Sequence, residues 1–309
     1  MNLNPSTQTY LFEHKEIFNQ LSKLFKNDNL PNKILLSGEK GIGKSTLAYH
    51  LINFVLSENE DQHYDYENNK INSENKSYKL IQNKSNPNFN LIDVLDDKKN
   101  ININQIRELI INLNKSSFNK KKRFVLIDNI ELLNINSINA LLKILEEPNE
   151  NINFILINNN KRVLPTLKSR CLNFKIFLTK NQSIRVVNQL INDDINNIIN
   201  NELIDNYTTP GKLFKLIELS EKYNLDLLNF DLITTIKTII RDKIYKKDKS
   251  IIEIIYSFIE LYFRNNISIE NISLLKSYHY FLEKINNTKV YNLDEETLFM
   301  EFEDKILNG

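Results

Sequence analysis

The chain has 309 residues, of which 41% are hydrophobic and 26% charged; this is enough apolar side chain for a folded core and more chain than one compact domain normally needs. Its 40 basic and 39 acidic residues give a formal net charge of +1, so bulk charge gives no reason to expect tight binding to nucleic acid or to an anionic membrane. Any contact with DNA would have to be local.

The single cysteine, Cys171, excludes an internal disulfide and a Cys-rich zinc site. No run of residues approaches the roughly 18 apolar positions of a membrane span, and residues 1–10 lack the basic-then-apolar pattern of a secretion signal. We therefore expect a cytoplasmic protein in a reducing compartment, with no zinc site and no membrane partner.

Helices alternate with short buried strands in the predicted elements of the first 178 residues. Such alternation predicts an α/β domain with a mostly parallel sheet that is covered on both faces. The polar segment 57–86 has no periodicity and is predicted to be an irregular insertion. The expected elements, in chain order, are helix 13–25, strand 34–36, helix 47–55, helix 103–113, strand 124–127, a helix over 138–145 that Pro148 terminates, strand 154–157, helix 163–168 and strand 172–177.

Beyond residue 178 the strand patterns stop and only helical spacing continues. A boundary within residues 226–235 is expected to divide this helical part in two, which gives three predicted domains at 1–178, 179–230 and 231–309. The predicted helices lie at 184–190, 213–219, 230–240, 251–263 and 272–285.

Three of the five glycines fall within six residues, between a predicted strand and a predicted helix. The segment Gly38-Glu39-Lys40-Gly41-Ile42-Gly43-Lys44-Ser45 fits the phosphate-loop pattern in that context. Its amides would cradle a triphosphate, Lys44 would reach the outer phosphates, Ser45 would ligate magnesium, and Thr46 would lie near the α-phosphate. The alternative is a loop inherited from a nucleotide-binding fold that no longer binds.

A carboxylate for magnesium is predicted at the end of the next strand, where Asp128 follows four apolar residues. The alternative for Asp128 is a turn residue that ends the strand. The following residue is Asn129, whose amide cannot accept a proton from an attacking water, and Glu131 is expected to point elsewhere. This combination predicts weak or vestigial binding of ATP and magnesium without efficient hydrolysis.

Five separate segments within residues 5–220 carry a family resemblance. They are the phosphate loop, Ile103-Asn104-Gln105-Ile106-Arg107, Leu126-Ile127-Asp128-Asn129, Asn139-Ala140-Leu141-Leu142-Lys143-Ile144-Leu145-Glu146-Glu147-Pro148 and Leu164-Pro165-Thr166-Leu167-Lys168-Ser169-Arg170-Cys171. Together they resemble the delta-prime subunit family of the bacterial DNA polymerase III clamp loader, in the AAA+ superfamily. The last two segments are the specific ones, and the motor-type gamma/tau subunits share them.

The resemblance implies a RecA-like AAA+ domain, a small helical lid domain and an all-helical collar domain for oligomerisation. It also implies that Arg170 is an arginine finger, offered in trans to ATP in a neighbouring subunit. From the residues alone, Arg170 follows a short helix and precedes a strand, at a domain edge where a planar guanidinium suits phosphate recognition. The alternative is an exposed arginine in an ordinary salt bridge.

Three other segments depart from the family pattern or leave their role open. Gly211 follows Thr209 and Pro210 at the expected start of the lid helix, where hydrolysing subunits carry a phosphate-sensing arginine. The segment 57–86 takes the place of the family's zinc module without one cysteine. The basic run 120–123 either touches DNA phosphates or forms a solvated edge.

These observations predict a stator-type subunit of the DNA polymerase III clamp loader, with little or no ATPase and no polymerase activity of its own. Its partners would be the gamma/tau and delta subunits, and through the complex the sliding clamp and primed DNA. One rival is an ATP-hydrolysing gamma/tau-type motor, which would need a glutamate at position 129 and an arginine at position 211. The other is a stand-alone P-loop phosphotransferase, which would need a substrate-hydroxyl site and a base.

Overall fold

The computed structural model of the chain describes residues 3–95, 98–114, 121–146, 151–161, 163–267 and 271–308. The chain divides into two compact units, Met1–Leu178 and Thr179–Gly309. The first unit holds a β-sheet with helices, and the described residues of the second form helices and turns.

Five parallel strands form one sheet in the first unit, in the order β2-β3-β4-β1-β5. The predicted α/β architecture with a parallel sheet is therefore confirmed. The strands are β1 Lys33–Ser37, β2 Phe89–Ile92, β3 Arg123–Ile127, β4 Ile152–Asn158 and β5 Leu172–Lys175.

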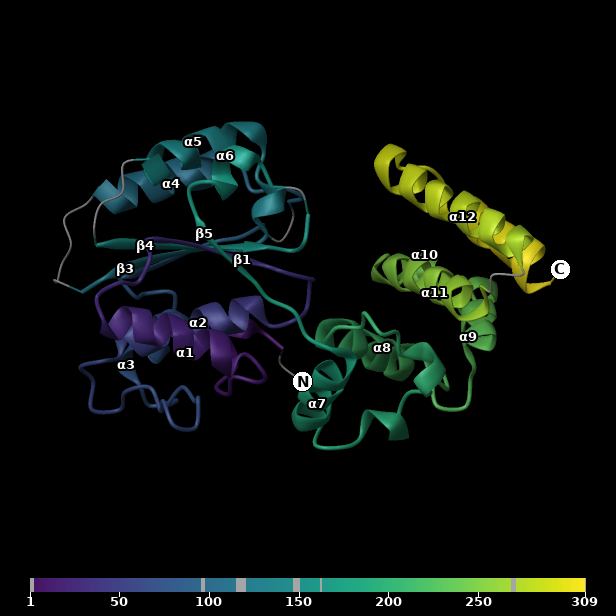
Figure 1. Cartoon of the computed structure of the whole chain (residues 1–309), viewed down its shortest axis with the longest axis horizontal. Helices are drawn as coiled ribbons and strands as arrows, with labels where there is room; N and C mark the ends of the chain where they lie inside the picture. Colours follow the sequence, from purple (N-terminus) through teal and green to yellow (C-terminus); the bar gives the residue numbers. More distant parts are fainter. Residues whose placement is uncertain are drawn as a thin grey trace. The chain divides into compact units, whose positions relative to one another are not determined.

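Helices cover both faces of this sheet (Figure 1). Ile34 and Leu36 of β1 belong to the core on the side of α1 and α2, whereas Leu35 belongs to the core on the side of α4 and α5. Because successive side chains of a strand alternate between faces, a strand buried on both sides is a continuous apolar run. The helices are α1 Lys15–Lys26, α2 Lys44–Leu56 and α3 Lys76–Gln82 on one face, and α4 Ile103–Asn114, α5 Ile135–Glu146 and α6 Pro165–Lys168 on the other.

Two elements of the first unit differ from the sequence expectation. The strand β2 was missed because it lies at the sheet edge, has Asn90 among its four residues, and buries only Ile92. The segment 57–86 was expected to be irregular, but it contains α3 and buries Tyr64 and Ile71 among the side chains that pack on α1 and α2. Its few apolar residues are too widely spaced in sequence to produce a periodic pattern.

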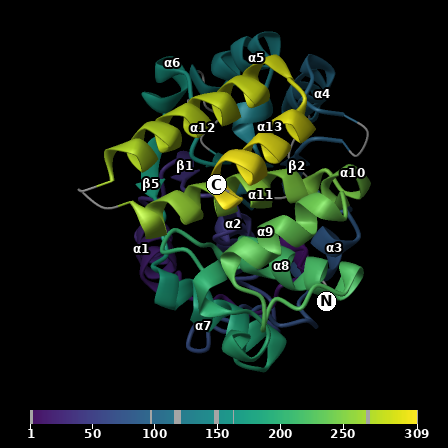
Figure 2. The ribbon, with the colours of Figure 1, turned by 90° about the vertical axis from the view of Figure 1, so that its right-hand side faces the viewer.

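The second unit has one hydrophobic core, whose buried side chains run from Val187 to Phe302. Figure 2 shows α12 and α13 side by side, and the two helices are in contact. The division into a lid and a collar near residue 230 stays a prediction. No helix among the described residues is both long and apolar enough to cross a lipid bilayer. The helices are α7 Lys180–Ile191, α8 Pro210–Tyr223, α9 Leu232–Arg241, α10 Ile244–Lys247, α11 Ser250–Asn266, α12 Ile272–Tyr291 and α13 Glu295–Phe302.

Candidate functional site

Residues 38–43 form the loop that joins β1 to α2, and Lys44 and Ser45 begin the helix, so the strand–loop–helix context of a phosphate loop is present. Gly41 and Gly43 have φ angles of 82° and 87°, in the left-handed region that residues with side chains rarely adopt. A Cβ atom at Gly38 would lie 2.2 Å from the carbonyl oxygen of Ile176. Close packing therefore requires glycine at position 38, and backbone conformation favours it at 41 and 43.

The side chain of Lys44 lies inside this loop and is 3% exposed. Its Nζ donates hydrogen bonds to the carbonyl oxygens of Gly38 at 2.9 Å and Glu39 at 2.6 Å. Burial lowers the pKa of Lys44 to about 8, while the carboxylates of Asp128 and Glu131 oppose the fall. A cation that has lost its hydration is stabilised by an anion, so this ammonium is suited to contact phosphate.

The two residues predicted to hold magnesium lie in direct contact. Ser45, in the first turn of α2, donates its hydroxyl proton to Oδ2 of Asp128 at 2.5 Å. Burial raises the pKa of the Asp128 carboxyl, and the hydrogen bond from Ser45 opposes the rise. A hydroxyl and a carboxylate beside a phosphate cradle fit a magnesium ion, which takes oxygen ligands and usually shares them with phosphates. Thr46 is half-buried in the same helical turn.

A chain of hydrogen bonds extends from Asn129 across the carboxyl ends of three strands. Its Nδ2 donates to Oδ1 of Asp93 at 2.8 Å, and its Oδ1 accepts from Nδ2 of Asn159 at 2.7 Å. The same Nδ2 of Asn159 donates to Oε1 of Glu131 at 2.9 Å. The amide of Asn129 is therefore held on both sides, between a carboxylate and a second amide.

The sequence did not predict two members of this series of hydrogen bonds, Asp93 and Glu131. Asp93 was not considered, because it follows β2, the strand that was not predicted. Glu131 was expected to point elsewhere, but it bonds Asn159 and is one of the carboxylates that act on Lys44. Of the two asparagines at the carboxyl end of β4, Asn159 reaches Asn129, while Nδ2 of Asn158 donates to the carbonyl oxygen of Lys161.

The guanidinium of Arg170 lies beyond the end of α6 with about a third of the side chain exposed. Its Nη2 donates to Oε1 of Glu146 at 2.5 Å, and its Nη1 donates to the carbonyl oxygen of Thr166 at 2.7 Å. Two of the segments that carried the family resemblance thus meet at this ion pair. The neighbouring Cys171 is half-buried, and burial raises the pKa of its thiol to about 11, so it stays protonated.

Two described residues of the basic run 120–123 are bonded to the ends of helices. Arg123 is 8% exposed, and its guanidinium donates to the carbonyl oxygens of Leu113 and Asn112 at the end of α4. Lys121 donates to a backbone carbonyl at the end of α2. These two side chains therefore hold helix ends; Lys120 lies outside the described residues.

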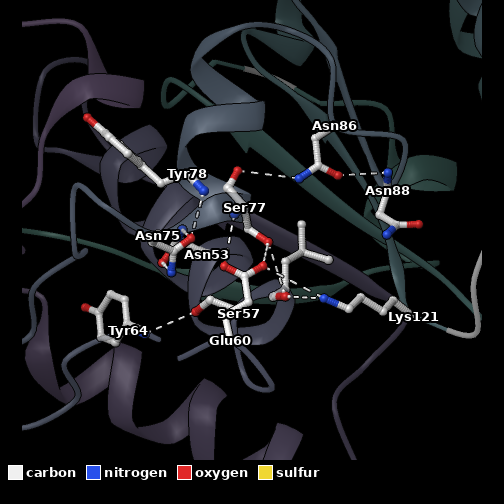
Figure 3. A network of polar contacts seen from close by, with 11 residues as sticks. Asn53, Ser57, Glu60, Tyr64, Asn75, Ser77, Tyr78, Asn86, Asn88 and Lys121 are labelled. Atoms are coloured by element: carbon white, nitrogen blue, oxygen red, sulfur yellow. Dashed lines mark hydrogen bonds and ion pairs between the residues drawn. The ribbon is translucent and has the colours of Figure 1, made fainter. Parts of the chain in front are cut away.

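Polar side chains hold the segment 57–86 in a network of hydrogen bonds (Figure 3). Asn53 of α2 donates to Oδ1 of Asn75 at 3.2 Å, and that oxygen also caps the start of α3. Ser77 donates from its hydroxyl and its backbone amide to the carboxylate of Glu60. Among the described residues, no three His, Cys, Asp or Glu side chains are arranged to hold a metal ion. Amide, hydroxyl and carboxylate groups hold this segment in place.

In the second unit, α8 begins at Pro210, and the side chain of Thr209 accepts a hydrogen bond from the backbone amide of Lys212 at 3.3 Å. Gly211 and Lys212 are both exposed in the first turn. This is the helix start at which the resemblance places the lid helix.

Residues 13–179 match the family model described as "DNA polymerase III, delta subunit". The chain belongs to this family. The DNA polymerase III subunit tau/gamma of Haemophilus influenzae is 28% identical over 176 residues, which cover 56% of this chain and 24% of that protein. The DNA polymerase III subunit delta' of Pseudomonas aeruginosa is 40% identical over 68 residues, which cover 22% of this chain and 21% of that protein. The matches span less than half the length of the first curated relatives.

A solved structure has the same fold. The gamma-subunit-related DNA polymerase III protein of Thermotoga maritima superposes with a TM-score of 0.51 at 18% identity, and the match covers 91% of this chain and 96% of that chain. At this identity the likeness establishes the fold alone. The resemblance stated from the sequence is confirmed at the level of DNA polymerase III subunits.

Proposed function

We propose that the chain is a stator-type, delta-prime-like subunit of a DNA polymerase III clamp loader. It assembles in the cytoplasm with gamma/tau and delta subunits and helps to load the sliding clamp onto primed DNA. Family membership supports the complex, and one observation carries the stator assignment: the amide of Asn129 is held between Asp93 and Asn159, where a hydrolysing subunit would present a carboxylate.

In this proposal the phosphate loop binds ATP weakly and the chain turns it over negligibly. Lys44 contacts the outer phosphates, and Ser45 and Asp128 hold the magnesium ion. That ion supplies positive charge that neutralises the phosphate oxygens. Asn129 can orient a water molecule but cannot take its proton.

Arg170 has the chemical role in trans. Its partly exposed side chain, after α6, offers a bidentate guanidinium to the ATP of an adjacent subunit. In the chain alone, Glu146 and the Thr166 carbonyl hold the guanidinium. Because the ion pair is partly solvated, a triphosphate can replace the carboxylate at little cost.

A gamma/tau-type motor is the second candidate, favoured by the direct contact of Ser45 with Asp128 and by the position of Glu131 near Lys44. Steady-state ATPase of the purified chain separates the two candidates. The stator predicts negligible turnover, and a motor predicts turnover that primed DNA and clamp stimulate.

The proposed function is tested by co-expressing the chain with gamma/tau and delta subunits and measuring the mass of the purified complex. We expect one defined complex that contains this chain and loads clamps onto primed DNA. A complex of gamma/tau and delta that excludes the chain, yet loads clamps at the full rate, would contradict the proposal.

A further inference from the structure

The imidazole of His14 is buried beneath the phosphate loop and has no role in the function proposed above. His14 is 5% exposed, and its Nε2 lies 2.5 Å from the carbonyl oxygen of Ile42, a residue of the loop. A carbonyl oxygen only accepts hydrogen bonds, so Nε2 carries the proton and donates it. Burial lowers the pKa of His14, which favours the neutral ring at neutral pH.

The ring of His14 also lies close to Gly43 of the loop. A Cβ atom on Gly43 would lie 3.4 Å from Nε2 and 3.6 Å from Cδ2 of His14. Both distances are ordinary van der Waals contacts, so the ring leaves room for a Cβ atom, and it is the φ angle of Gly43 that favours glycine there.

The residue before His14 has an unfavourable backbone conformation. Glu13 has a φ angle of 57°, and the amide of His14 donates to the carbonyl oxygen of Phe12 at 2.7 Å, which closes a three-residue turn around Glu13. A left-handed conformation is unfavourable for glutamate, and such strain persists where the surrounding structure requires it.

Ile42 and Gly43 share one planar peptide group, in which the C=O and the N–H point in opposite directions. The imidazole holds the C=O, so the Gly43 amide points away from His14. We propose that His14 is a positioning residue of the phosphate loop: its Nε2–H fixes the Ile42–Gly43 peptide so that the Gly43 amide stays available to phosphate oxygens. The inference rests on the proposed binding of phosphates by this loop.

The test compares three variants by isothermal titration with inorganic tripolyphosphate and with ATP, both with magnesium. His14→Leu removes the donor, and His14→Gln can still donate from its side-chain amide. His50→Leu is the matched control, because His50 is also buried in the first unit and also contacts a backbone carbonyl, that of Gln8, away from the loop. A structural role would affect His14→Leu and His50→Leu alike.

We expect His14→Leu to weaken tripolyphosphate and ATP binding about 10- to 100-fold. This is the range expected when one hydrogen bond to a charged group, here from the Gly43 amide to a phosphate oxygen, is lost. His14→Gln and His50→Leu should bind within about threefold of the wild type. In NMR spectra of the free protein, the Gly43 amide resonance should shift or broaden in His14→Leu and stay sharp in the other two variants.

Wild-type affinity in His14→Leu would overturn the inference and leave the proposed phosphate binding intact. Equal losses in His14→Leu and His50→Leu would overturn it as well, because they would show a general loss of structure. Absence of any binding by the wild-type chain would overturn the proposed phosphate binding and this inference together, while assembly of the clamp loader would be unaffected.

Discussion

The phosphate loop and the edge around Arg170 are both suited to phosphate, but they are held in different ways. In the loop, Lys44 is buried and bonded to two backbone carbonyls, and the glycines are fixed by packing and by their φ angles. At the edge, Arg170 is held by a single carboxylate and one carbonyl and remains about a third exposed. A change in the loop should therefore alter the folded chain itself, whereas a change at the edge should appear only when a second subunit is present.

The largest effect is expected for Arg170→Ala. Loss of an arginine finger reduces turnover at the site it completes by about 10³- to 10⁵-fold, and several ATP sites in one loader would dilute this in the bulk rate. The chain should stay folded, because a partly exposed ion pair contributes about 1 kcal/mol or less. DNA-dependent ATPase and clamp loading by reconstituted complexes measure the effect.

Two control variants separate the role of the guanidinium from that of the ion pair with Glu146. Arg170→Lys should rescue poorly, because an ammonium cannot span two phosphate oxygens as a guanidinium does. Glu146→Ala breaks the same ion pair but keeps the guanidinium, so the complex should retain most of its activity. Wild-type clamp loading by the Arg170→Ala complex would show that this edge has no chemical role.

The next largest effect is expected for Gly38→Ala in the loop. The added Cβ atom would meet the backbone oxygen of Ile176 at 2.2 Å, and backbone cannot rotate away as a side chain can. Overpacking of this kind should lower the free energy of unfolding by about 3 kcal/mol. Gly211→Ala, exposed in the first turn of α8, is the matched control and should change it by about 0.5 kcal/mol or less. Urea denaturation compares the two variants, and equal effects would refute the close packing at Gly38.

A smaller effect is expected from pH. The pKa of Lys44 is about 8 in the free loop, and in the proposed function ATP contacts the protonated ammonium. Affinity for magnesium-free ATP should therefore be nearly constant below pH 8 and fall up to about tenfold per pH unit above it, until Lys44 in the complex also deprotonates. Titration calorimetry from pH 6.5 to 10 measures the profile, and Lys44→Arg should flatten it. A profile that stays flat in the wild type would show that Lys44 does not contact the phosphates.

The smallest effect is expected for Asn129→Glu. The new carboxylate would face Oδ1 of Asp93, which now accepts a hydrogen bond from the Asn129 amide. Repulsion should turn it from the site, so the ATPase rate of the chain should rise less than about tenfold. The double variant Asp93→Asn with Asn129→Glu restores a donor opposite the carboxylate and should be faster than the single variant. Fast hydrolysis by Asn129→Glu alone would show that neither Asp93 nor the missing arginine at position 211 limits the rate, and that the lid helix is misassigned.

Much of the first unit could be predicted because its signals are local. Continuous apolar runs predicted β1, β3 and β4, because a strand that is buried on both faces has apolar side chains at successive positions. The glycines marked the phosphate loop, because close approach and left-handed backbone exclude side chains there. The edge strand β2 has no such run. Because β2 was not predicted, Asp93, which follows it, was not predicted as part of the site.

The sequence by itself determined the parallel α/β unit, the helical unit that follows it, and the residues of the phosphate loop. Only the tertiary structure decided that Asn129 is held between Asp93 and Asn159, that Arg123 is buried at the end of α4, and that His14 lies against the loop. The physical reason is that periodicity records which face of an element is buried, whereas a contact between side chains distant in sequence depends on the order of the strands and on how the segments between them pack.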